Sequence, residues 1–201
     1  EKAIDGDQRE RVDDSEIDRD YRSYCQLVMT DNLGDRWLGT GFLVSPQTVC
    51  TAAHNLVNYR SVKVTLGLHG SNAAPSQLTD RRNWEWTSSF PNDVFEDYAF
   101  IQLPQPFPAK PNQVFFWPAE FTMDRFSDWV TTNRIFEITG YPIEVCNQPG
   151  GRCFGNETSL FRRRQSIRGS IFKPELDPRV MMHKLDASRG QSGAPLVIAN
   201  E

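Results

Sequence analysis

A serine flanked by two glycines is the feature of this sequence that could most directly carry out chemistry. Residues 190–195 read Gly-Gln-Ser-Gly-Ala-Pro, a run of small and turn-forming residues that suits a tight loop with an exposed hydroxyl at Ser192. Gly190 has no Cβ, so its backbone N–H could approach a substrate carbonyl closely. The N–H groups of Gly190 and Ser192 could then form an oxyanion hole. Because Gly-x-Ser-Gly also occurs in ordinary turns, a nucleophile here needs support from other residues.

Two other stretches supply the partners that a serine nucleophile requires. The hydroxyl needs a base within hydrogen-bond reach, and the base needs a carboxylate that fixes its tautomer. His54 ends the sequence Thr-Ala-Ala-His, and Asp97 opens the sequence Asp-Tyr-Ala-Phe-Ile. We therefore predict a catalytic triad in which Asp97 orients His54 and His54 accepts the proton of Ser192. The other two histidines, His69 and His183, have no such context and are predicted to be structural or exposed.

The order of these residues along the chain, His54 before Asp97 before Ser192, matches the chymotrypsin-like template and differs from the subtilisin and α/β-hydrolase orders. The stretches TAAH, DYAFIQL and GQSGAPL resemble the three catalytic motifs of chymotrypsin-like serine proteases. Finer features resemble the bacterial glutamyl endopeptidase branch of these proteases: IDGDQRERV followed by YCQLVM, then ITGYP, and LDASRGQSG leading into the nucleophile. The resemblance covers nearly the whole chain.

This resemblance implies an all-β fold of two six-stranded antiparallel β-barrels, with His54 and Asp97 in the first barrel and Ser192 in the second. It implies a secreted serine endopeptidase that acts on peptide or protein substrates through an acyl-enzyme, without a cofactor, and prefers Glu or Asp before the scissile bond. The family continues past its nucleophile for longer than this sequence does. We therefore expect the second barrel to lack its last strands, and a C-terminal fragment of the same precursor to complete it, because missing strands would leave unpaired edges.

The residues expected near the specificity pocket leave the substrate preference open. The glutamyl branch commonly has Thr or Ser five positions before the nucleophile, whereas this sequence has Ala187 there, followed by Ser188. In that branch the N-terminal amino group also helps to bind the acidic side chain, and the match places the comparable group close to Lys2. Asp186 lies where trypsin-type enzymes hold a pocket carboxylate, so a preference for Arg or Lys is an alternative. Relatives with acidic specificity also carry Asp there, so Asp186 does not decide between the two.

Gln191 departs from the trypsin-type pattern. Trypsin-type zymogens have an Asp immediately before the nucleophile that pairs with a new N-terminus, and Gln191 cannot make that ion pair. A second class of function is a catalytically silent protease homologue that binds a partner through its cleft or through the basic run Arg162–Arg164. That run is otherwise predicted to be a solvated or ion-paired turn before a strand, or to contact an acidic substrate or the acidic N-terminal arm.

Composition and turn signals divide the chain into four parts. Residues 1–20, crowded with charged side chains, form an arm that is either solvated and loosely ordered or, as the resemblance implies, packed near the pocket. Residues 21–103 contain short β-type runs between turn signals and are predicted to form the first barrel. Residues 104–113 are rich in proline, which cannot lie inside a sheet, and are predicted to connect the barrels. Residues 114–201 are predicted to form the second barrel, with a short helix or an irregular loop at residues 121–132.

The individual strands are predicted from short apolar runs. In the first part they are Cys25–Met29, Trp37–Val44, Val49–Ala52, Val62–Leu66 and Asp97–Leu103. In the last part they are Val114–Trp117, Ile135–Gly140, Ser166–Phe172, Val180–Leu185 and Ala194–Ile198. Residues 31–35 are predicted to form a hairpin turn. Trp84 and Trp86, two positions apart, are expected on one face of a strand and in the core.

The overall composition is that of a soluble globular protein. Of the 201 residues, 38% are hydrophobic and 24% are charged. No run of about 18 apolar residues is present, so no membrane partner is predicted. The net charge of −4 does not suggest a nucleic-acid partner.

Four cysteines and a glycosylation sequon favour a secreted protein with two disulfides. Cys146 and Cys153 bracket a turn-rich loop that a disulfide could close. Cys25 and Cys50 lie in strand-like runs and could bridge neighbouring strands, or be buried free thiols. Asn156 begins the sequon Asn-Glu-Thr. No cysteine or histidine spacing resembles a zinc site, so no metal is predicted.

Overall fold

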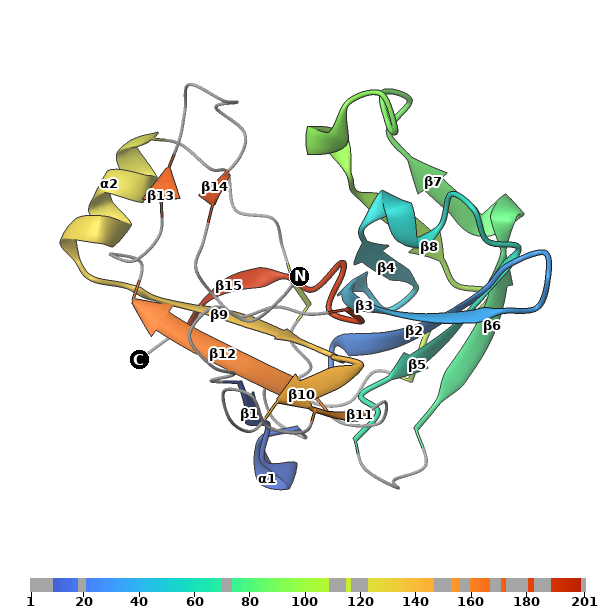
Figure 1. Ribbon diagram of the computed structural model, residues 1–201, viewed down its shortest axis with the longest axis horizontal. Helices are drawn as coiled ribbons and strands as arrows, with labels where there is room; N and C mark the ends of the chain where they lie inside the picture. Colours follow the sequence, from blue (N-terminus) through green and yellow to red (C-terminus); the bar gives the residue numbers. More distant parts are fainter. Residues whose placement is uncertain are drawn as a thin grey trace.

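The structure is a computed structural model that describes residues 9–17, 21–69, 74–108, 115–116, 123–146, 153–155, 160–166, 171–172, 181–182 and 189–199. Figure 1 shows that this part of the chain consists mainly of strands, with few helical turns. They form a seven-stranded sheet, a four-stranded sheet and two two-stranded sheets, β10-β11 and β13-β14. The strands are β1 (Glu10–Arg11), β2 (Tyr24–Thr30), β3 (Arg36–Ser45), β4 (Thr48–Thr51), β5 (Ser61–Leu66), β6 (Ser76–Asp80), β7 (Trp84–Trp86), β8 (Ala99–Gln102), β9 (Ile135–Gly140), β10 (Glu144–Cys146), β11 (Cys153–Gly155), β12 (Phe161–Ser166), β13 (Ile171–Phe172), β14 (Met181–Met182) and β15 (Leu196–Ala199). The helices are α1 (Asp14–Ile17), α2 (Met123–Thr131) and the 3₁₀ turns η1 (Ala53–Asn55), η2 (Arg81–Asn83) and η3 (Val94–Glu96).

The first sheet has seven antiparallel strands in the order β6-β5-β2-β3-β4-β8-β7. Successive residues of a strand point to opposite faces, so alternate positions of β2 (Cys25, Leu27 and Met29) enter the core on the inner face of the curled sheet. Trp84 is buried in the same core and Trp86 packs against it, which confirms the core role predicted for this pair. Every strand predicted for this part of the chain is present, with ends shifted by one or two residues.

The predicted hairpin turn between β2 and β3 is also confirmed. One carboxylate oxygen of Asp31 accepts hydrogen bonds from the backbone N–H groups of Leu33 and Asp35, each over 2.9 Å. An aspartate that bonds its own backbone in this way is a common means of closing a turn. The turn therefore fixes the register in which Thr30 faces Arg36.

Cys25 and Cys50 do not form the disulfide that was one of the two predictions for them. Both are free thiols, Cys25 fully buried and Cys50 partly so. The reason lies in the strand order: Cys25 on β2 faces Gly41 of β3, and Cys50 on β4 faces Phe42 of β3 from the other side. Two strand spacings amount to about 9.5 Å, and a disulfide spans at most about 6.8 Å between Cα atoms. Cys146 and Cys153, by contrast, are direct partners across β10 and β11.

The second sheet has four antiparallel strands in the order β1-β12-β9-β15. Phe136 and Ile138 of β9 form its small core with the apolar residues of β15, and α2 packs on it through Trp129, whose ring contacts Phe136 with 6.0 Å between centroids. The helical alternative for residues 121–132 is therefore correct. Of the predicted strand Ser166–Phe172, Ser166 is the last residue of β12 and Ile171–Phe172 form β13 in a different sheet, while residues 167–170 lie outside the described part.

The acidic N-terminal segment and the basic run Arg162–Arg164 come together in this sheet. The prediction of a turn before a strand is wrong for the basic run, which lies inside β12. Arg162 faces Glu10 of β1 and binds its carboxylate over 2.6 Å, and Arg164 faces Glu137 of β9 and binds it over 2.6 Å. These are cross-strand charge pairs, so the described arm residues 9–17 are attached to the sheet. A loosely ordered, solvated arm is wrong for these residues.

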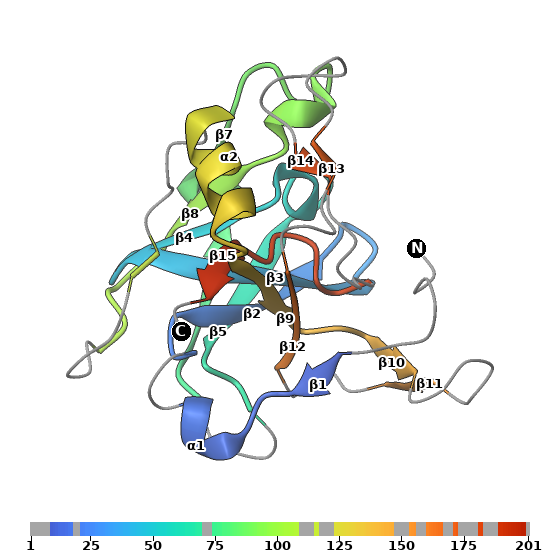
Figure 2. The same ribbon diagram turned by 90° about the vertical axis from the view of Figure 1, so that its left-hand side faces the viewer.

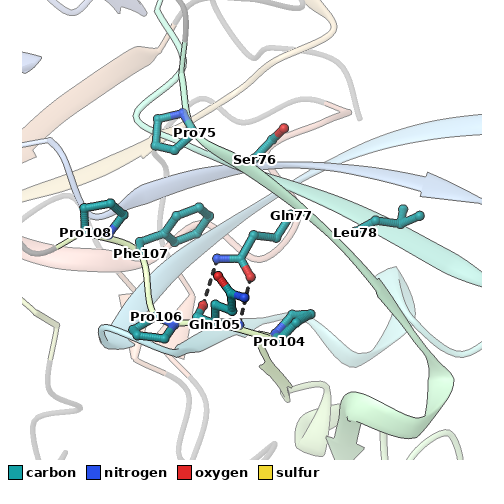
Figure 3. Close-up of a pocket in the computed structure, with 9 residues that line it drawn as sticks. All are labelled: Pro75, Ser76, Gln77, Leu78, Pro104, Gln105, Pro106, Phe107 and Pro108. Carbon is teal, nitrogen blue, oxygen red and sulfur yellow. Dashed lines mark hydrogen bonds between the residues drawn. The ribbon is translucent and has the colours of Figure 1, made fainter.

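The proline-rich segment begins where the first sheet ends. Gln77 of the edge strand β6 pairs with the backbone of Gln105: its side-chain NH₂ donates to the Gln105 carbonyl over 2.8 Å, and the Gln105 N–H donates to its amide oxygen over 3.1 Å (Figure 3). Because Pro104 and Pro106 have no N–H, the segment cannot add a regular strand to this edge. Phe107 then inserts into the first core. Residues 104–108 are thus attached to the sheet without belonging to it.

Several predictions concern residues outside the described part. These are the pocket residues Lys2, Asp186, Ala187 and Ser188, the sequon at Asn156, and His183. Of the predicted strand Val114–Trp117, only Phe115 and Phe116 are described, and neither lies in a strand. Phe116 instead packs edge-on against the rings of Tyr24 and Phe42. The C-terminal fragment and the four-part domain division stay predictions.

Candidate active site

His54 and Asp97 meet because two neighbouring strands end at the same place. The last pair of β4 and β8 joins Thr51 to Ala99, and β4 and β8 are antiparallel. His54 follows Thr51 by three residues within the 3₁₀ turn η1, and Asp97 precedes Ala99 by two, so both emerge from one end of the strand pair. The register of the sheet therefore places the two side chains beside each other without any long connecting loop.

The Asp97 carboxylate binds His54 at two points. One oxygen lies 2.5 Å from the ring nitrogen Nδ1, and the other accepts the backbone N–H of His54 over 2.8 Å. This bidentate contact fixes the ring's orientation as well as its position. When Nδ1 carries the proton that Asp97 accepts, Nε2 is the nitrogen that can accept another proton. The His54 side chain is 48% exposed, so its outer edge is open to a ligand.

The pKa of Asp97 lies below the ordinary value for an aspartate. Burial by itself raises it, but the hydrogen bonds from the His54 side chain and backbone, together with the charge of His54, outweigh burial. Asp97 is therefore a carboxylate at neutral pH. An ionised partner holds the imidazole in one tautomer and stabilises it when it gains a proton.

Ser192 lies in the loop that directly precedes β15 along the chain, and Figure 1 shows the end of this loop at β15. The loop is held residue by residue: the carbonyls of Arg189, Gly190, Gln191 and Ser192 accept hydrogen bonds from the Ile143 N–H, the Thr40 hydroxyl, the Ala194 N–H and the Thr40 N–H, over 2.8 to 2.9 Å. All but one of these donors come from outside the loop. The backbone of the nucleophile loop is thus fixed by Thr40 of β3 and by Ile143, which lies between β9 and β10.

Two glycines permit this path. Gly190 has φ = 89° and Gly193 has φ = 85°, conformations that L-residues with a side chain rarely adopt. A Cβ on Gly190 would collide with the carbonyl of Tyr141, and one on Gly193 with the Thr51 hydroxyl and the Thr40 carbonyl. The Gly-x-Ser-Gly pattern therefore meets a conformational and a steric requirement at both ends.

The directions of two N–H groups follow from these hydrogen bonds. In a trans peptide the carbonyl and the following N–H point in opposite directions. The Arg189 carbonyl points at the Ile143 N–H and the Gln191 carbonyl at the Ala194 N–H. The Gly190 and Ser192 N–H groups therefore point away from Ile143 and Ala194 respectively.

Asn55 connects the His54 side of the site to the Ser192 side. Its side-chain NH₂ donates to the Ser192 carbonyl over 2.9 Å and to the Thr51 hydroxyl over 3.0 Å. The Thr51 hydroxyl donates in turn to the Thr40 carbonyl over 2.7 Å. Asn55, Thr51 and Thr40 are all buried, so this network, which we call the junction network, is shielded from water.

The sequence analysis missed the junction network. Asn55 directly follows His54 and Thr51 opens the TAAH motif. A polar residue next to the proposed base, inside an otherwise apolar segment, was the available signal. Thr40 had no such signal because it lies in the middle of a predicted strand. It became visible only once β3 and the loop 189–194 were placed together.

Comparison with known proteins identifies the family. The sequence profile described as "Trypsin-like peptidase domain" matches residues 39–201. The chain belongs to this family. The family assignment agrees with the resemblance of the three motifs to chymotrypsin-like proteases, whereas the glutamyl endopeptidase branch stays a prediction. No curated protein matches the sequence of this trypsin-like peptidase domain.

Solved structures confirm the chymotrypsin-like fold of this trypsin-like peptidase domain. It is similar to HL collagenase (TM-score 0.60, 18% identity, 89% of this chain and 76% of that one). It is similar to human heparin binding protein (TM-score 0.64, 14% identity, 95% and 79%). It is also similar to the protease Anisep from Arthrobacter nicotinovorans (TM-score 0.59, 16% identity, 90% and 78%). Identities this low establish the fold alone.

The remaining candidate sites of the trypsin-like peptidase domain lie away from this junction. A groove of about 420 Å³ lies between β6 and the proline-rich segment (Figure 3), and none of His54, Asp97 and Ser192 lines it.

Among the described side chains, no group of three or more His, Cys, Asp or Glu could hold a metal ion. No helix of the described part is long and apolar enough to cross a membrane. His69 is buried and its Nδ1 accepts the Leu160 N–H over 3.4 Å, a structural role as predicted.

Proposed function

We propose that this chain is a serine endopeptidase in which Ser192 is the nucleophile, His54 the general base and Asp97 the residue that orients His54. The observation that carries the proposal is the junction of the two halves of the site. The His54–Asp97 pair stands directly beside Asn55, and Asn55 holds the backbone of Ser192. The family assignment supports peptide hydrolysis as the reaction.

The proposed reaction follows from the protonation pattern of the pair. With Nδ1 directed at Asp97, Nε2 of His54 accepts the proton of the Ser192 hydroxyl as its oxygen attacks the peptide carbonyl. The N–H groups of Gly190 and Ser192 stabilise the oxyanion of the tetrahedral intermediate. His54 then donates its proton to the leaving amine, and the peptide C–N bond breaks to give an acyl-enzyme. His54 then takes a proton from a water molecule, whose oxygen attacks the ester carbonyl. The bond between this carbon and the Ser192 oxygen breaks, His54 gives the proton to that oxygen, and the carboxylic acid product leaves.

We further propose a preference for Glu or Asp before the scissile bond. The stretches IDGDQRERV, ITGYP and LDASRGQSG support it through their similarity to the glutamyl endopeptidase branch. The alternative is a preference for Arg or Lys through Asp186.

Secretion, a Cys146–Cys153 disulfide and a glycan at Asn156 belong to the same proposal. The disulfide is supported by the register, because residues directly opposite in an antiparallel pair have Cα atoms about 4.5 to 5.5 Å apart.

A peptide library and an active-site probe test the proposal together. The purified protein should react with a fluorophosphonate at Ser192 and cleave a mixed peptide library after Glu or Asp, and Ser192→Ala should abolish both. Cleavage after Arg or Lys would contradict the acidic preference and assign the pocket to Asp186. A folded protein that neither labels nor cleaves would contradict the enzyme proposal and favour a binding module.

A further inference from the structure

The residue before Ser192 is held by a side chain from the far end of the sequence. Arg9 donates a hydrogen bond from Nη1 to the side-chain oxygen Oε1 of Gln191 over 2.8 Å. Arg9 is only 9% exposed and Gln191 only 3%. A guanidinium is costly to bury unless it is hydrogen-bonded, and its bond to a neutral amide is charge-assisted. The contact is therefore a built feature of the interior and not a chance meeting of surface side chains.

The segment that carries Arg9 is fixed to the second sheet. Its next two residues form β1, which pairs with β12, and Figure 2 shows these two strands side by side. Val12 is fully buried and its N–H donates to the Leu160 carbonyl over 3.0 Å. Arg162 of β12 binds the carboxylates of Glu10 and Glu16 over 2.6 and 2.7 Å. Arg9 thus projects from a rigidly attached element.

Gln191 is the point through which this element can act on the nucleophile. It lies between Gly190, whose backbone is in the positive-φ region, and Ser192. Glycine restricts its own backbone least of all residues, so a buried side chain at the intervening position adds a restraint to the backbone hydrogen bonds that already hold this loop. Gln191 does this through Arg9, and its carbonyl accepts the Ala194 N–H over 2.9 Å. Movement of the Gln191 side chain would turn the neighbouring peptide groups, which carry the N–H groups of Gly190 and Ser192.

We propose that Arg9 is a positioning residue for the nucleophile loop: by holding the Gln191 side chain it keeps the Gly190 and Ser192 peptides in the conformation needed for catalysis. The inference rests on the proposed peptidase function for its kinetic consequence, but not for its structural one. Gln191 cannot form an ion pair, and the N-terminal segment reaches it with a side-chain guanidinium from within the chain. Docking of the segment 9–17 and ordering of the loop 189–194 are consequently coupled.

Coupling of this kind is reciprocal. If docking of the arm orders the loop, then a ligand that orders the loop must strengthen docking of the arm. Covalent modification of Ser192 by a fluorophosphonate should therefore slow hydrogen exchange not only at residues 189–194 but also at residues 9–12. Residues 10–12 bind β12 and the Leu160 carbonyl, so protection there on modification of Ser192 would pass through Arg9 and Gln191.

A double-mutant cycle at Arg9 and Gln191 tests the proposal. Arg9→Met should lower kcat about 10- to 100-fold with little change in KM, as expected when a reacting group is displaced by a fraction of an ångström. Gln191→Met should lower kcat to a similar extent. The kcat of the double variant should be no lower than that of the less active single variant, because the two residues act as one unit. Arg11→Met, at an exposed position of the adjoining strand β1, is the matched control and should keep wild-type kcat. Losses that multiply in the double variant, or a wild-type kcat in Arg9→Met, would overturn the proposal.

Hydrogen exchange of residues 189–194, followed by mass spectrometry, tests the structural half independently of activity. Exchange should be faster in Arg9→Met than in the wild type and unchanged in Arg11→Met. If the wild type proves not to be a peptidase, this measurement still decides the positioning role, and equal exchange in Arg9→Met and wild type overturns it. Should Arg9→Met fail to fold, Arg9→Lys keeps the charge but loses the long reach of the guanidinium, and is expected to show the same changes in smaller measure.

Discussion

The side chain of Asn55 donates a hydrogen bond to the backbone carbonyl of Ser192 over 2.9 Å. Asn55 belongs to the 3₁₀ turn that carries His54, whereas Ser192 belongs to the loop before β15. This bond therefore joins the segment that carries the proposed base to the segment that carries the proposed nucleophile. Thr40 completes the connection, because its N–H donates to the same carbonyl. The relative position of His54 and Ser192 is thus set by the backbone and the junction network, independently of any bond between the two side chains.

Replacement of Asn55 should impair both catalysis and stability. Asn55→Ala removes two buried hydrogen bonds, which should lower the free energy of unfolding by about 1 to 3 kcal/mol. It also releases the Ser192 carbonyl on the His54 side, and kcat should fall about 10- to 100-fold. Urea denaturation and steady-state kinetics measure the two effects. Asn58→Ala, at an exposed position of the same segment, is the control and should change neither. An Asn55→Ala enzyme with wild-type kcat would rule out this role.

The close approach at Gly193 can be separated from its backbone conformation. Gly193 and Gly34 have similar φ values, 85° and 92°, but a Cβ on Gly34 would meet nothing within 4 Å. Gly34→Ala should therefore cost only the conformational strain, about 1 to 2 kcal/mol. Gly193→Ala should cost clearly more in the free energy of unfolding, because its Cβ would collide with Thr51 and Thr40, and should abolish labelling of Ser192 by a fluorophosphonate. Equal losses of stability in the two variants would contradict the steric argument.

Asp97→Asn should reduce kcat by about 10⁴-fold while leaving the fold intact. An amide presents an NH₂ group where the carboxylate accepted the His54 ring proton, so the imidazole is held in the wrong tautomer. Asp35→Asn, at an exposed turn position, should have wild-type activity. Measurement of kcat at pH 8 for both variants checks this. A loss of less than tenfold in Asp97→Asn would mean that Asp97 does not orient His54.

The stability contributed by Asp97 should depend on pH in a defined direction. Its pKa is lower in the folded protein than in the unfolded chain, because the hydrogen bonds from His54 outweigh burial. The contribution is therefore fully present above the ordinary aspartate pKa of about 3.9 and is lost as the pH falls through the lowered folded value. The difference in free energy of unfolding between wild type and Asp97→Asn should be larger at pH 5 than at pH 3. A difference that grows toward pH 3 would contradict the assigned pKa direction.

The four cysteines should divide into two pairs by their reaction with iodoacetamide. In the native protein at pH 8, Cys25 should not react and Cys50 should react slowly, because burial raises the pKa of both thiols, that of Cys50 to about 11. In denaturant without reductant, both should be alkylated completely. Cys146 and Cys153 should become reactive only after reduction if they form the proposed disulfide. Resistance of Cys25 and Cys50 to alkylation in denaturant would contradict their assignment as free thiols.

The strands of the first sheet and its hairpin turn could be read from short apolar runs and turn residues. Alternation between core and surface leaves a pattern of period two in β8, and Asp31 signals its turn by residue type. For the basic run Arg162–Arg164, the predicted turn was wrong, whereas the alternative of a contact with the acidic N-terminal arm is confirmed by the bonds from Arg162 to Glu10 and Glu16. Three consecutive arginines resemble a solvated turn, and the acidic partners that place them in a strand, Glu10 and Glu137, are distant in the sequence.

By itself, the sequence determined which residues could carry out the chemistry, because a nucleophile, a base and a carboxylate are recognised by type, local motif and order along the chain. It also determined the all-β class, since short apolar runs between turn residues are a local property. Only the tertiary structure decided that Cys25 and Cys50 stand on strands too far apart to be bridged, and that Thr40, Asn55 and Arg9 hold the nucleophile loop. The physical reason is that strand order, burial and hydrogen bonds between distant segments arise only when the chain folds, and no local pattern encodes which segments will meet.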